Sequence, residues 1–437
     1  MKQTGKLGSA LLAVMTALCC AGCGMFRQIG ESSGGTAQTA AKGSAPVGTG
    51  ANQTVTGTAA GSATTTSATT TETTLPPTAP DITVNMLAVG DNLVQEGVYK
   101  AAKKWAKDGT YDFTKTYENV KPIIQAADVA IINQETLICG GDYPISGTKL
   151  NFCSPVQLGD TMVDVGFDVF TIANNHMLDR RIDGLEASIN YWDGMMAKHD
   201  ILALGAYRNT EDQNKIRVRE TKGMKIAYLA YTEHLNGYSI PADSPIKVGI
   251  TLRDEALIER QIKEAKQIAD AVIVSPHWGV EDTNVVADRC KVLAKKMIGW
   301  GADVILGTHT HTAETMEYID RPDGTRGFVF YSLGNFISAQ TDNFNVVGEM
   351  GGFDLVKHGD TGKVTVENVT CMPVITHYEA QFANLRLYPY SKYTPELANS
   401  HALPYTHVYP ETAKDFGMKT IDRIIENNIP AEFRKLK

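Results

Sequence analysis

The sequence predicts an α/β fold, and three observations predict it. From Asp81 onward, short apolar strands alternate with helical stretches. This alternation is typical of a domain whose strands are buried on both faces. Five of the predicted strands also run directly into Asp, Glu, Asn or His residues. Because such sheets bind ligands beyond the carboxyl ends of their strands, these polar residues mark the expected ligand-binding edge.

The first half of this pattern holds four strands and the helices between them. Strands are expected at 82–89, 128–132, 168–173 and 201–204. Helices are expected at 94–106, 120–127, 155–165 and 182–197. The first three strands lead into the polar groups Gly90-Asp91, Asn133-Gln134-Glu135 and Asn174-Asn175-His176.

The second half repeats the alternation. Strands are expected at 224–231, 271–274 and 302–306, followed by a hairpin at 315–319 and 327–331. Helices are expected at 285–300 and at 252–269, where Ile258, Ile262, Ala265 and Ala269 form one apolar stripe. The strand at 271–274 leads to His277, and the strand at 302–306 leads to Gly307-Thr308-His309-Thr310-His311.

Composition divides the chain into four regions. The expected regions are an export signal at 1–23, a linker at 24–80, the α/β domain at 81–344 and an extension at 345–437. The extension begins with strands, continues through a Tyr- and Pro-rich stretch and ends in a helix. It is either a structural extension or a small second domain, and its residues indicate no chemistry.

The N-terminus resembles a bacterial export signal. Lys2 and Lys6 precede an apolar stretch at 7–20, which is too short to span a bilayer comfortably. Small residues before Cys23 resemble the lipobox of bacterial lipoproteins, although Cys20 stands where the lipobox usually has Leu. We therefore expect Cys23 to carry a lipid that anchors the protein on the outer face of the cell membrane. Ordinary signal cleavage, which would give a secreted protein, is the alternative.

The linker at 24–80 is rich in Thr, Ala, Ser and Gly and carries very few charges. Such a segment cannot fill a core, so we expect it to be disordered. Its random-coil reach is on the order of 40 Å. It would tether the folded domain clear of a membrane.

The chain has a net charge of −8. An acidic protein is a poor partner for nucleic acid or another polyanion, unless bound cations or a local basic patch reverse the sign. The folded part contains Cys139, Cys153, Cys290 and Cys371, whose spacing matches no zinc module. In an exported protein, Cys139 and Cys153 either form a disulfide or remain two buried thiols.

The strand-end residues predict a metal site when they are taken together. Individually, Asp91 reads as a helix cap, Glu135 as a loop carboxylate and His176 as a core histidine. His309 and His311 are harder to explain in this way, because two imidazoles follow a strand and a flexible glycine. Five strand ends that place metal-binding side chains at one sheet edge favour a shared site.

The strand-end motifs resemble the bacterial capsule synthesis protein CapA family, which includes poly-γ-glutamate synthesis accessory proteins. The resemblance covers about residues 82–340. It rests on these motifs, in this order: Gly90-Asp91, Asn133-Gln134-Glu135-Thr136, Ala173-Asn174-Asn175-His176-Met177-Leu178-Asp179, His277-Trp278-Gly279-Val280-Glu281, Gly307-Thr308-His309-Thr310-His311 and Tyr331-Ser332-Leu333-Gly334-Asn335-Phe336. Because that family is similar to calcineurin-like metallophosphoesterases, the resemblance implies a four-layer α/β/β/α sandwich after the tether.

The resemblance also implies a site for one or two divalent metal ions. Asp91 and His311 would bind the first metal, and Glu135 would bridge both. Oxygen and imidazole ligands without a thiolate suit Mn²⁺, Fe or Zn²⁺. Two such ions could activate water and hold a phosphoryl group.

The second metal would be bound by Asn175, His277 and His309. His176, next to Asn175, would donate a proton to the leaving group, since the usual pKa of histidine suits that role. His176 and Asn175 are therefore the expected catalytic residues.

One departure from the phosphoesterase pattern leaves two functions open. Leu93 stands where that pattern has a histidine, so the first metal loses one imidazole. The first hypothesis is a metal-dependent hydrolase or transferase that acts on an extracellular anionic polymer or its precursor. The second is a non-catalytic accessory module that grips such a polymer through one metal. In either case membrane-bound synthesis or export proteins are expected partners.

Overall fold

A computed structural model describes residues 79–141, 143–148, 151–405 and 411–437, which belong to one compact unit. The predictions for the export signal, for Cys23 and for almost all of the linker fall outside these ranges. Among the helices that the structure describes, none is long and apolar enough to cross a membrane.

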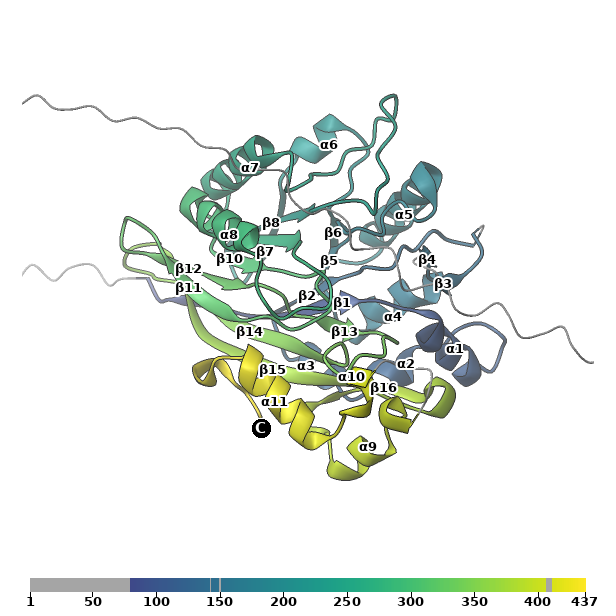
Figure 1. Cartoon of the computed structure of the whole chain (residues 1–437). Coiled ribbons are helices and arrows are strands. Elements are labelled where there is room, and N and C mark those ends of the chain that lie inside the picture. Colours follow the sequence, from purple (N-terminus) through teal and green to yellow (C-terminus); the bar gives the residue numbers. More distant parts are fainter. Residues whose placement is uncertain (1–78, 142, 149–150, 406–410) are drawn as a thin grey trace, which may run out of the picture. The chain divides into compact units, whose positions relative to one another are not determined.

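Two β-sheets form the centre of the fold (Figure 1). The larger sheet has eight strands: β1 (Ile82–Asn92), β2 (Val129–Asn133), β5 (Val169–Thr171), β6 (Leu202–Leu204), β13 (Asn335–Ile337), β14 (Val347–Lys357), β15 (Val364–Glu379) and β16 (Ala383–Pro389). Seven of them follow the order β16-β15-β14-β1-β2-β5-β6, and β13 pairs with the end of β1. The β1-β2-β5-β6 part is parallel, so these strands end at one edge.

The smaller sheet has six strands in the order β11-β12-β10-β9-β8-β7. Their bounds are β7 (Arg217–Thr221), β8 (Met224–Thr232), β9 (Ala271–His277), β10 (Val304–Leu306), β11 (Met316–Asp320) and β12 (Arg326–Phe330). Strands β8, β9, β10 and β12 are parallel, and β11 and β12 form the predicted hairpin. A separate hairpin joins β3 (Ser146–Thr148) to β4 (Asn151–Cys153).

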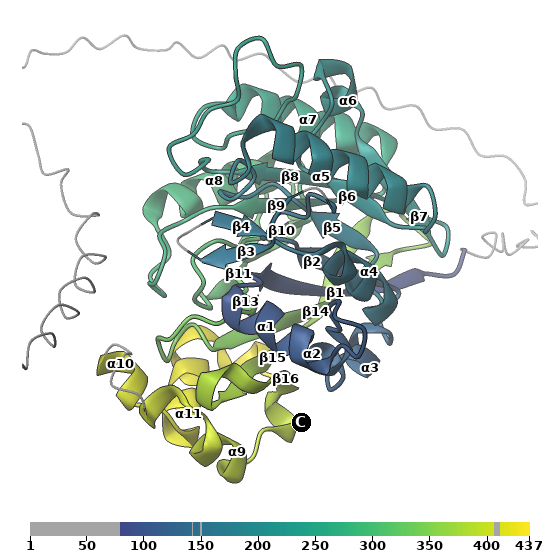
Figure 2. The same ribbon diagram turned by 90° about the vertical axis from the view of Figure 1, so that its right-hand side faces the viewer.

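Helices cover the outer faces of both sheets, as Figures 1 and 2 show. Helices α7 (Glu255–Ile268) and α8 (Asp288–Trp300) contact strands of the smaller sheet. The larger sheet is flanked by α1 (Glu96–Trp105), α2 (Thr114–Tyr117), α3 (Lys121–Ile124), α4 (Val156–Val165) and α11 (Met418–Asn428). The remaining α-helices in the described part of the chain are α5 (Arg181–Met196), α6 (Thr210–Asn214), α9 (Pro395–Ser400) and α10 (Glu411–Lys414). The predicted α/β/β/α layering is confirmed.

Strand β8 shows why the fold has four layers. Ile226, Tyr228 and Ala230 belong to the core between the sheets, whereas the alternate residues Ala227 and Leu229 belong to the core under α7 and α8. Since successive strand residues point to opposite faces, β8 is buried on both sides, as the sequence predicts. The two sheets also meet directly, because the rings of Phe330 on β12 and Phe353 on β14 lie 6.3 Å apart.

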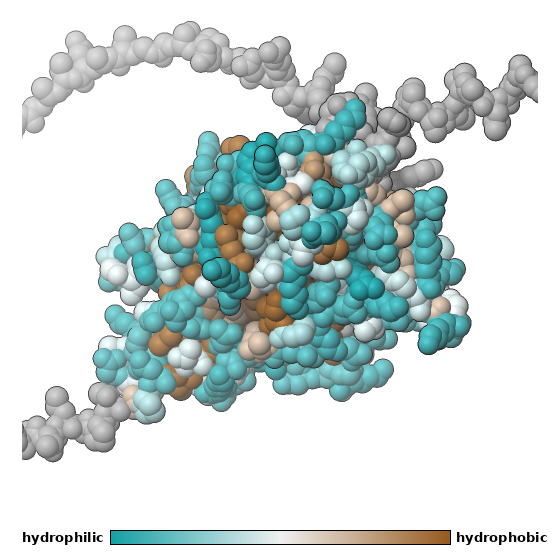
Figure 3. Space-filling model, turned by 90° about the horizontal axis from the view of Figure 1, so that it is seen from below, coloured by the Kyte–Doolittle hydropathy of each residue, from teal (hydrophilic) through white to brown (hydrophobic). Residues whose placement is uncertain are grey.

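The C-terminal extension joins the larger sheet. β14 lies between β1 and β15 and pairs antiparallel with β1, with Val84 opposite Leu355. The helix expected at 120–127 is shorter than predicted and covers only Lys121–Ile124. Seen from the side on which α9 and α11 lie, the surface is mainly hydrophilic, with scattered hydrophobic patches (Figure 3).

Candidate metal centre

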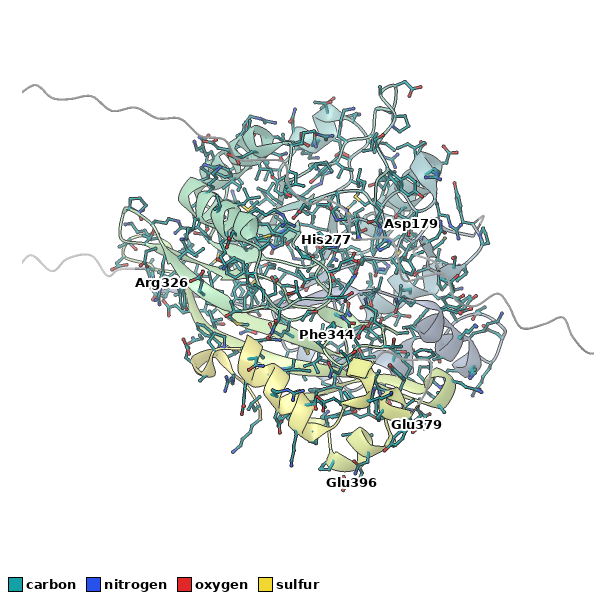
Figure 4. All side chains as sticks on the ribbon, in the orientation of Figure 1. Asp179, His277, Arg326, Phe344, Glu379 and Glu396 are labelled. Carbon is teal, nitrogen blue, oxygen red and sulfur yellow. The ribbon has the colours of Figure 1, made fainter. Side chains whose placement is uncertain are left out.

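The predicted site residues come together at the carboxyl ends of β1, β2, β5, β9 and β10. Each residue is at most 4% exposed: Asp91, Glu135, Asn175, His176, His277, His309 and His311. Figure 4 shows His277, the last residue of β9, near the middle of the fold. The seven side chains therefore occupy one buried region, although they come from distant parts of the chain.

Glu135 lies at the centre of this region. Its Oε1 atom is 3.7 Å from His277 Nε2, 3.8 Å from His311 Nε2 and 3.9 Å from His176 Nε2. Within the described residues, neither carboxylate oxygen has a hydrogen-bond partner. Buried carboxylates are normally paired, so these oxygens are suited to bind a group that the protein itself does not supply.

Asp91 approaches Glu135 from the end of β1. Its Oδ1 accepts a hydrogen bond from the Asn133 amide at 2.7 Å, and its Oδ2 accepts from the His309 backbone N–H at 3.1 Å. In the described part of the chain, Asp91, Glu135 and His311 form a group whose ligand atoms all lie within 4.8 Å of one another. These are the residues that the resemblance assigns to the first metal.

Asn335 orients His311 toward this group. The His311 Nδ1 atom lies 3.1 Å from Asn335 Oδ1, so its N–H can donate to that oxygen. The other ring nitrogen, Nε2, then faces Glu135. Metal-binding histidines usually donate their second ring N–H to a fixed acceptor in this way. Asn335 belongs to one of the motifs that carry the resemblance, and the structure indicates its role.

The residues expected for the second metal also meet. His277 Nε2 lies 3.0 Å from Asn175 Oδ1, while its Nδ1 is 2.9 Å from Thr308 Oγ1. The rings of His277 and His309 are 4.6 Å apart. His309 Nδ1 is buried without a hydrogen-bond partner among the described residues. This second position is thus offered an amide oxygen and two imidazoles.

His176 is held beside Glu135 by residues to which the sequence analysis gave no role. Its Nδ1 lies 2.9 Å from Asp179 Oδ2, and the Phe152 backbone N–H donates to the same oxygen at 2.7 Å. The Phe152 ring packs edge-on against the imidazole at 4.5 Å. These contacts leave His176 Nε2 facing Glu135.

The loop after β8 contributes two residues that the sequence analysis missed. His234 Nε2 lies 3.3 Å from His309 Nε2, and Asn236 Oδ1 accepts a hydrogen bond from the Asn175 amide at 3.2 Å. The same loop lines a cavity of ≈ 550 Å³. The signal that could have found these residues is the one used elsewhere, a polar cluster directly after a predicted strand.

The backbone geometry after β10 explains why position 307 is a glycine, and it indicates strain at His309 and His311. A Cβ on Gly307 would lie 1.8 Å from the carbonyl oxygen of Tyr331, so only glycine allows this close approach. His309 and His311 have φ angles of 99° and 58°. Non-glycine residues rarely adopt positive φ, and such strain tends to gather at functional sites.

The buried charges shift one another's ionisation. Burial, and next the Asp91 carboxylate, raise the pKa of Glu135 well above its usual value. Burial works to lower the pKa of His311, but the Glu135 and Asp91 carboxylates outweigh it and raise this pKa to about 10. Burial and the neighbouring imidazoles lower the pKa values of His277 and His309. A neutral imidazole is the form that binds metal, so His277 and His309 are already in the binding form, whereas His311 gives up a proton when it binds.

Two further sequence predictions concern residues close to the site. Leu93 is buried, and its backbone N–H donates to Ile337 O at 3.0 Å. Because its side chain is aliphatic, it offers the first metal no ligand. Cys139 and Cys153 are buried free thiols whose side chains hydrogen-bond to each other. The two cysteines are therefore not joined by a disulfide, which is one of the two alternatives that the sequence left open.

Fold and site together define an α/β/β/α protein with a buried carboxylate and imidazole cluster that fits a divalent metal. This fit rests on unpaired buried atoms. Within the residues that the structure describes, the two carboxylate oxygens of Glu135 and the Nδ1 atom of His309 have no hydrogen-bond partner. The model of the family described as "Bacterial capsule synthesis protein PGA_cap" matches residues 85–340, more than half of the chain. The chain belongs to this family.

Curated relatives carry names that agree with this family. The chain is 30% identical over 255 residues to the "PGA biosynthesis protein CapA" of Bacillus subtilis (strain 168), an alignment that covers 58% of this chain and 62% of the relative. It is 27% identical over 264 residues to the "Capsule biosynthesis protein CapA" of Bacillus anthracis, covering 59% and 60%. The chain thus spans less than two thirds of the length of both relatives.

Solved structures that align with the chain include two enzymes by title. A novel phosphatase from Mycoplasma pneumoniae aligns with 16% identity and a TM-score of 0.39, over 67% of this chain and 94% of that one. A 5'-nucleotidase precursor from Thermus thermophilus aligns with 12% identity and a TM-score of 0.42, over 79% and 59%. Likeness at this level carries no argument about chemistry.

Proposed function

We propose that this protein takes part in the synthesis, export or anchoring of a capsule or cell-wall polymer of the poly-γ-glutamate type through a metal-dependent, hydrolase-like site. Family membership supports the polymer context. The observation that carries the chemistry is the buried Glu135 carboxylate, which lacks hydrogen-bond partners among the described residues and faces Asp91 and three imidazoles.

Six side chains would hold the metal. Asp91, Glu135 and His311 supply the first position, whereas Asn175, His277 and His309, with Glu135, supply the second. A bound pair of divalent ions provides Lewis-acid chemistry for hydrolysis of a phosphoester. The protein's own contribution is to exclude bulk water, because all six side chains are buried, and to fix the direction of each donor atom.

His176 would move a proton. Asp179 and Phe152 fix its ring, so that Nε2 points toward Glu135, where a substrate oxygen would lie. Because Asp179 occupies Nδ1, the proton that His176 gives to a leaving alkoxide would come from Nε2. General acid catalysis of this kind contributes about 10²–10⁴-fold to a rate.

The test of this proposal is a phosphodiesterase assay on the purified protein reloaded with Mn²⁺, Fe²⁺ or Zn²⁺, with bis(p-nitrophenyl) phosphate as substrate. We expect His176→Ala to lower kcat by about 10²–10⁴-fold and His309→Ala to lower metal content as well as turnover. The exposed His199 gives a matched control, His199→Ala, which should leave both unchanged. Equal turnover in the wild type, His176→Ala and His309→Ala would reject the proposal.

We also propose that the protein is exported and anchored to the outer face of the membrane through a lipid on Cys23. The apolar stretch at 7–20 and the small residues before Cys23 support this proposal. Its partners would be an anionic extracellular polymer or its precursor and membrane-bound synthesis or export proteins. Cys23→Ser should move the protein from the membrane fraction to the medium, and unchanged membrane association would contradict the anchor.

Leu93 favours a second candidate function, a non-catalytic module that grips the polymer through its metal. With Leu93 in place of an imidazole, the first position has a weaker ligand set. A protein with a net charge of −8 should repel poly-γ-glutamate unless a bound cation bridges them. Metal-dependent binding of poly-γ-glutamate without turnover is the expected result. An absence of binding, with metal and without it, rejects this function.

A further inference from the structure

We propose that His234 and Asn236 are positioning residues for the second metal position, the one offered by Asn175, His277 and His309. This inference rests on the proposed function, because it assumes that the cluster binds metal. Neither residue belongs to the motifs that carry the family resemblance. Both lie on the loop that follows β8.

The loop after β8 is fixed against the site by a backbone hydrogen bond and a side-chain hydrogen bond. The Glu233 backbone N–H donates to His277 O at 2.8 Å, so the loop leaves the sheet beside a site histidine. The Thr232 hydroxyl donates to His234 O at 3.0 Å. Asn236 and Gly237 then adopt φ angles of 49° and 77°, which turn the chain back. This turn aims the Asn236 side chain into the site.

Asn236 sets which end of the Asn175 amide faces the second position. The Asn175 Nδ2 atom donates to Asn236 Oδ1 at 3.2 Å and to Glu281 Oε1 at 3.5 Å. With its nitrogen engaged by these two acceptors, Asn175 presents Oδ1 to His277. The amide oxygen has lone pairs for a cation, whereas the amide nitrogen is a donor only. Without Asn236 the amide nitrogen keeps only the longer 3.5 Å hydrogen bond to Glu281, which holds the orientation of the amide less firmly.

His234 acts in the same way on His309. The Nε2 atoms of the two rings are 3.3 Å apart, and the rings meet at an interplanar angle of 77°. The other ring nitrogen of His309, Nδ1, has no hydrogen-bond partner in the described part of the chain. When a cation takes Nδ1, the proton of His309 lies on Nε2 and is donated to His234 Nε2, which fixes the ring. His234 then carries its own proton on Nδ1 and gives up the 3.3 Å hydrogen bond that this nitrogen accepts from the Asn236 backbone N–H. His234 is only half-buried and also lines the ≈ 550 Å³ cavity.

The first position does not depend on this loop. Its residues Asp91 and His311 are held by Asn133 and Asn335. Loss of Asn236 or His234 should therefore weaken one ion and spare the other. Removing such orienting partners typically costs 10–100-fold in metal affinity.

The test is isothermal titration calorimetry of the full-length protein with Mn²⁺ or Zn²⁺. Asn236→Gly deletes the amide but tolerates the positive φ, and Asn236→Asp keeps an acceptor for Asn175. We expect Asn236→Gly and His234→Ala to weaken one ion by about 10–100-fold and leave the other within about twofold. Asn236→Asp should restore most of that affinity. The matched control is Asn368→Gly, since Asn368 is exposed and has a φ of 48°.

The outcomes separate this inference from the proposed function. A wild-type protein that binds no metal rejects the proposed function and, with it, the premise of the inference. A wild-type protein that binds metal, with every affinity unchanged in Asn236→Gly and His234→Ala, rejects the inference alone. Failure of Asn236→Asp to restore binding contradicts the role given to the acceptor oxygen. Circular dichroism of each variant checks that the fold is retained.

Discussion

Two buried glutamates in this protein have the same exposure and opposite surroundings. Glu135 is 0% exposed and Glu349, on β14, is 1% exposed. Within the described residues neither carboxylate has a hydrogen-bond partner, apart from the contact of Glu349 with the Cys371 thiol. Burial raises the pKa of both well above the usual value. Burial alone therefore does not tell a metal ligand from a protonated core residue.

The residues around each carboxylate distinguish Glu135 from Glu349. Glu135 faces Asp91, His277 and His311, which are the proposed metal ligands around it, and the proposed proton donor His176. Glu349 lies near the Glu314 carboxylate and beside the Cys371 thiol, which offsets the effect of burial only in part. Cys371 is itself buried, and its pKa is raised well above the usual value, so it stays a neutral thiol. The raised pKa of Glu349 thus favours its protonated form, and no imidazole is among these neighbours, whereas Glu135 is suited to hold a metal.

The largest expected effect is that of Glu135→Gln on metal binding. An amide in place of the bridging carboxylate removes the negative charge that both positions share. We expect affinity to fall by more than about 100-fold, beyond the 10–100-fold typical of residues that only orient ligands. Isothermal titration calorimetry with Mn²⁺ measures the loss. Glu349→Gln is the matched control, and an equal loss in both variants would break the distinction between the two glutamates.

The next effect is that of Glu349→Gln on stability. The raised folded-state pKa stabilises the protein below the unfolded value of 4.5, and this contribution is lost as pH rises through the folded pKa. Glutamine removes the proton-dependent penalty, so the free energy of unfolding should rise by about 1–3 kcal/mol at pH 8. Urea unfolding at pH 4 and pH 8 measures it. The gain should nearly vanish at pH 4, and the same gain at both pH values would show that protonation is not its cause.

Glu314→Gln should have the smallest effect. Glu314 is buried after the His311 turn, and burial raises its pKa to about 7, with Lys291 and Arg289 opposing the rise. The stability that its proton provides is present below 4.5 and lost between 4.5 and about 7. The gain from Glu314→Gln should therefore level off above pH 7, whereas that from Glu349→Gln continues to grow. Melting temperatures at half-unit pH steps test this difference, and a Glu314→Gln gain that keeps growing to pH 9 would contradict it.

The sequence predicted most of the site because strand ends are local features. Apolar runs that stop at Asp91, His277 or His309 can be read directly, and parallel strands bring such ends to one edge. The order of the elements and the burial of both strand faces followed from the same pattern. The missing imidazole at Leu93 was also visible, yet Asp91, Glu135 and His311 still converge.

The parts that were not predicted depend on long-range geometry. The polar cluster after β8 marks His234 and Asn236 as candidates, but not their partners, because Asn236 reaches Asn175 across 61 residues and His234 reaches His309 across 75. The pairing of β14 with β1 joins residues about 270 positions apart, such as Val84 and Leu355, and hydrophobicity alone does not select that partner. Propensity likewise did not predict the short β3–β4 hairpin, which places Phe152 against His176.

Anomalous X-ray diffraction from crystals soaked in Mn²⁺ tests most directly whether the five strand ends share a metal site. We predict an anomalous peak bounded by Asp91, Glu135 and His311, and a second peak bounded by Glu135, Asn175, His277 and His309. The absence of any peak among these side chains at saturating Mn²⁺, or peaks confined to other parts of the protein, would contradict it.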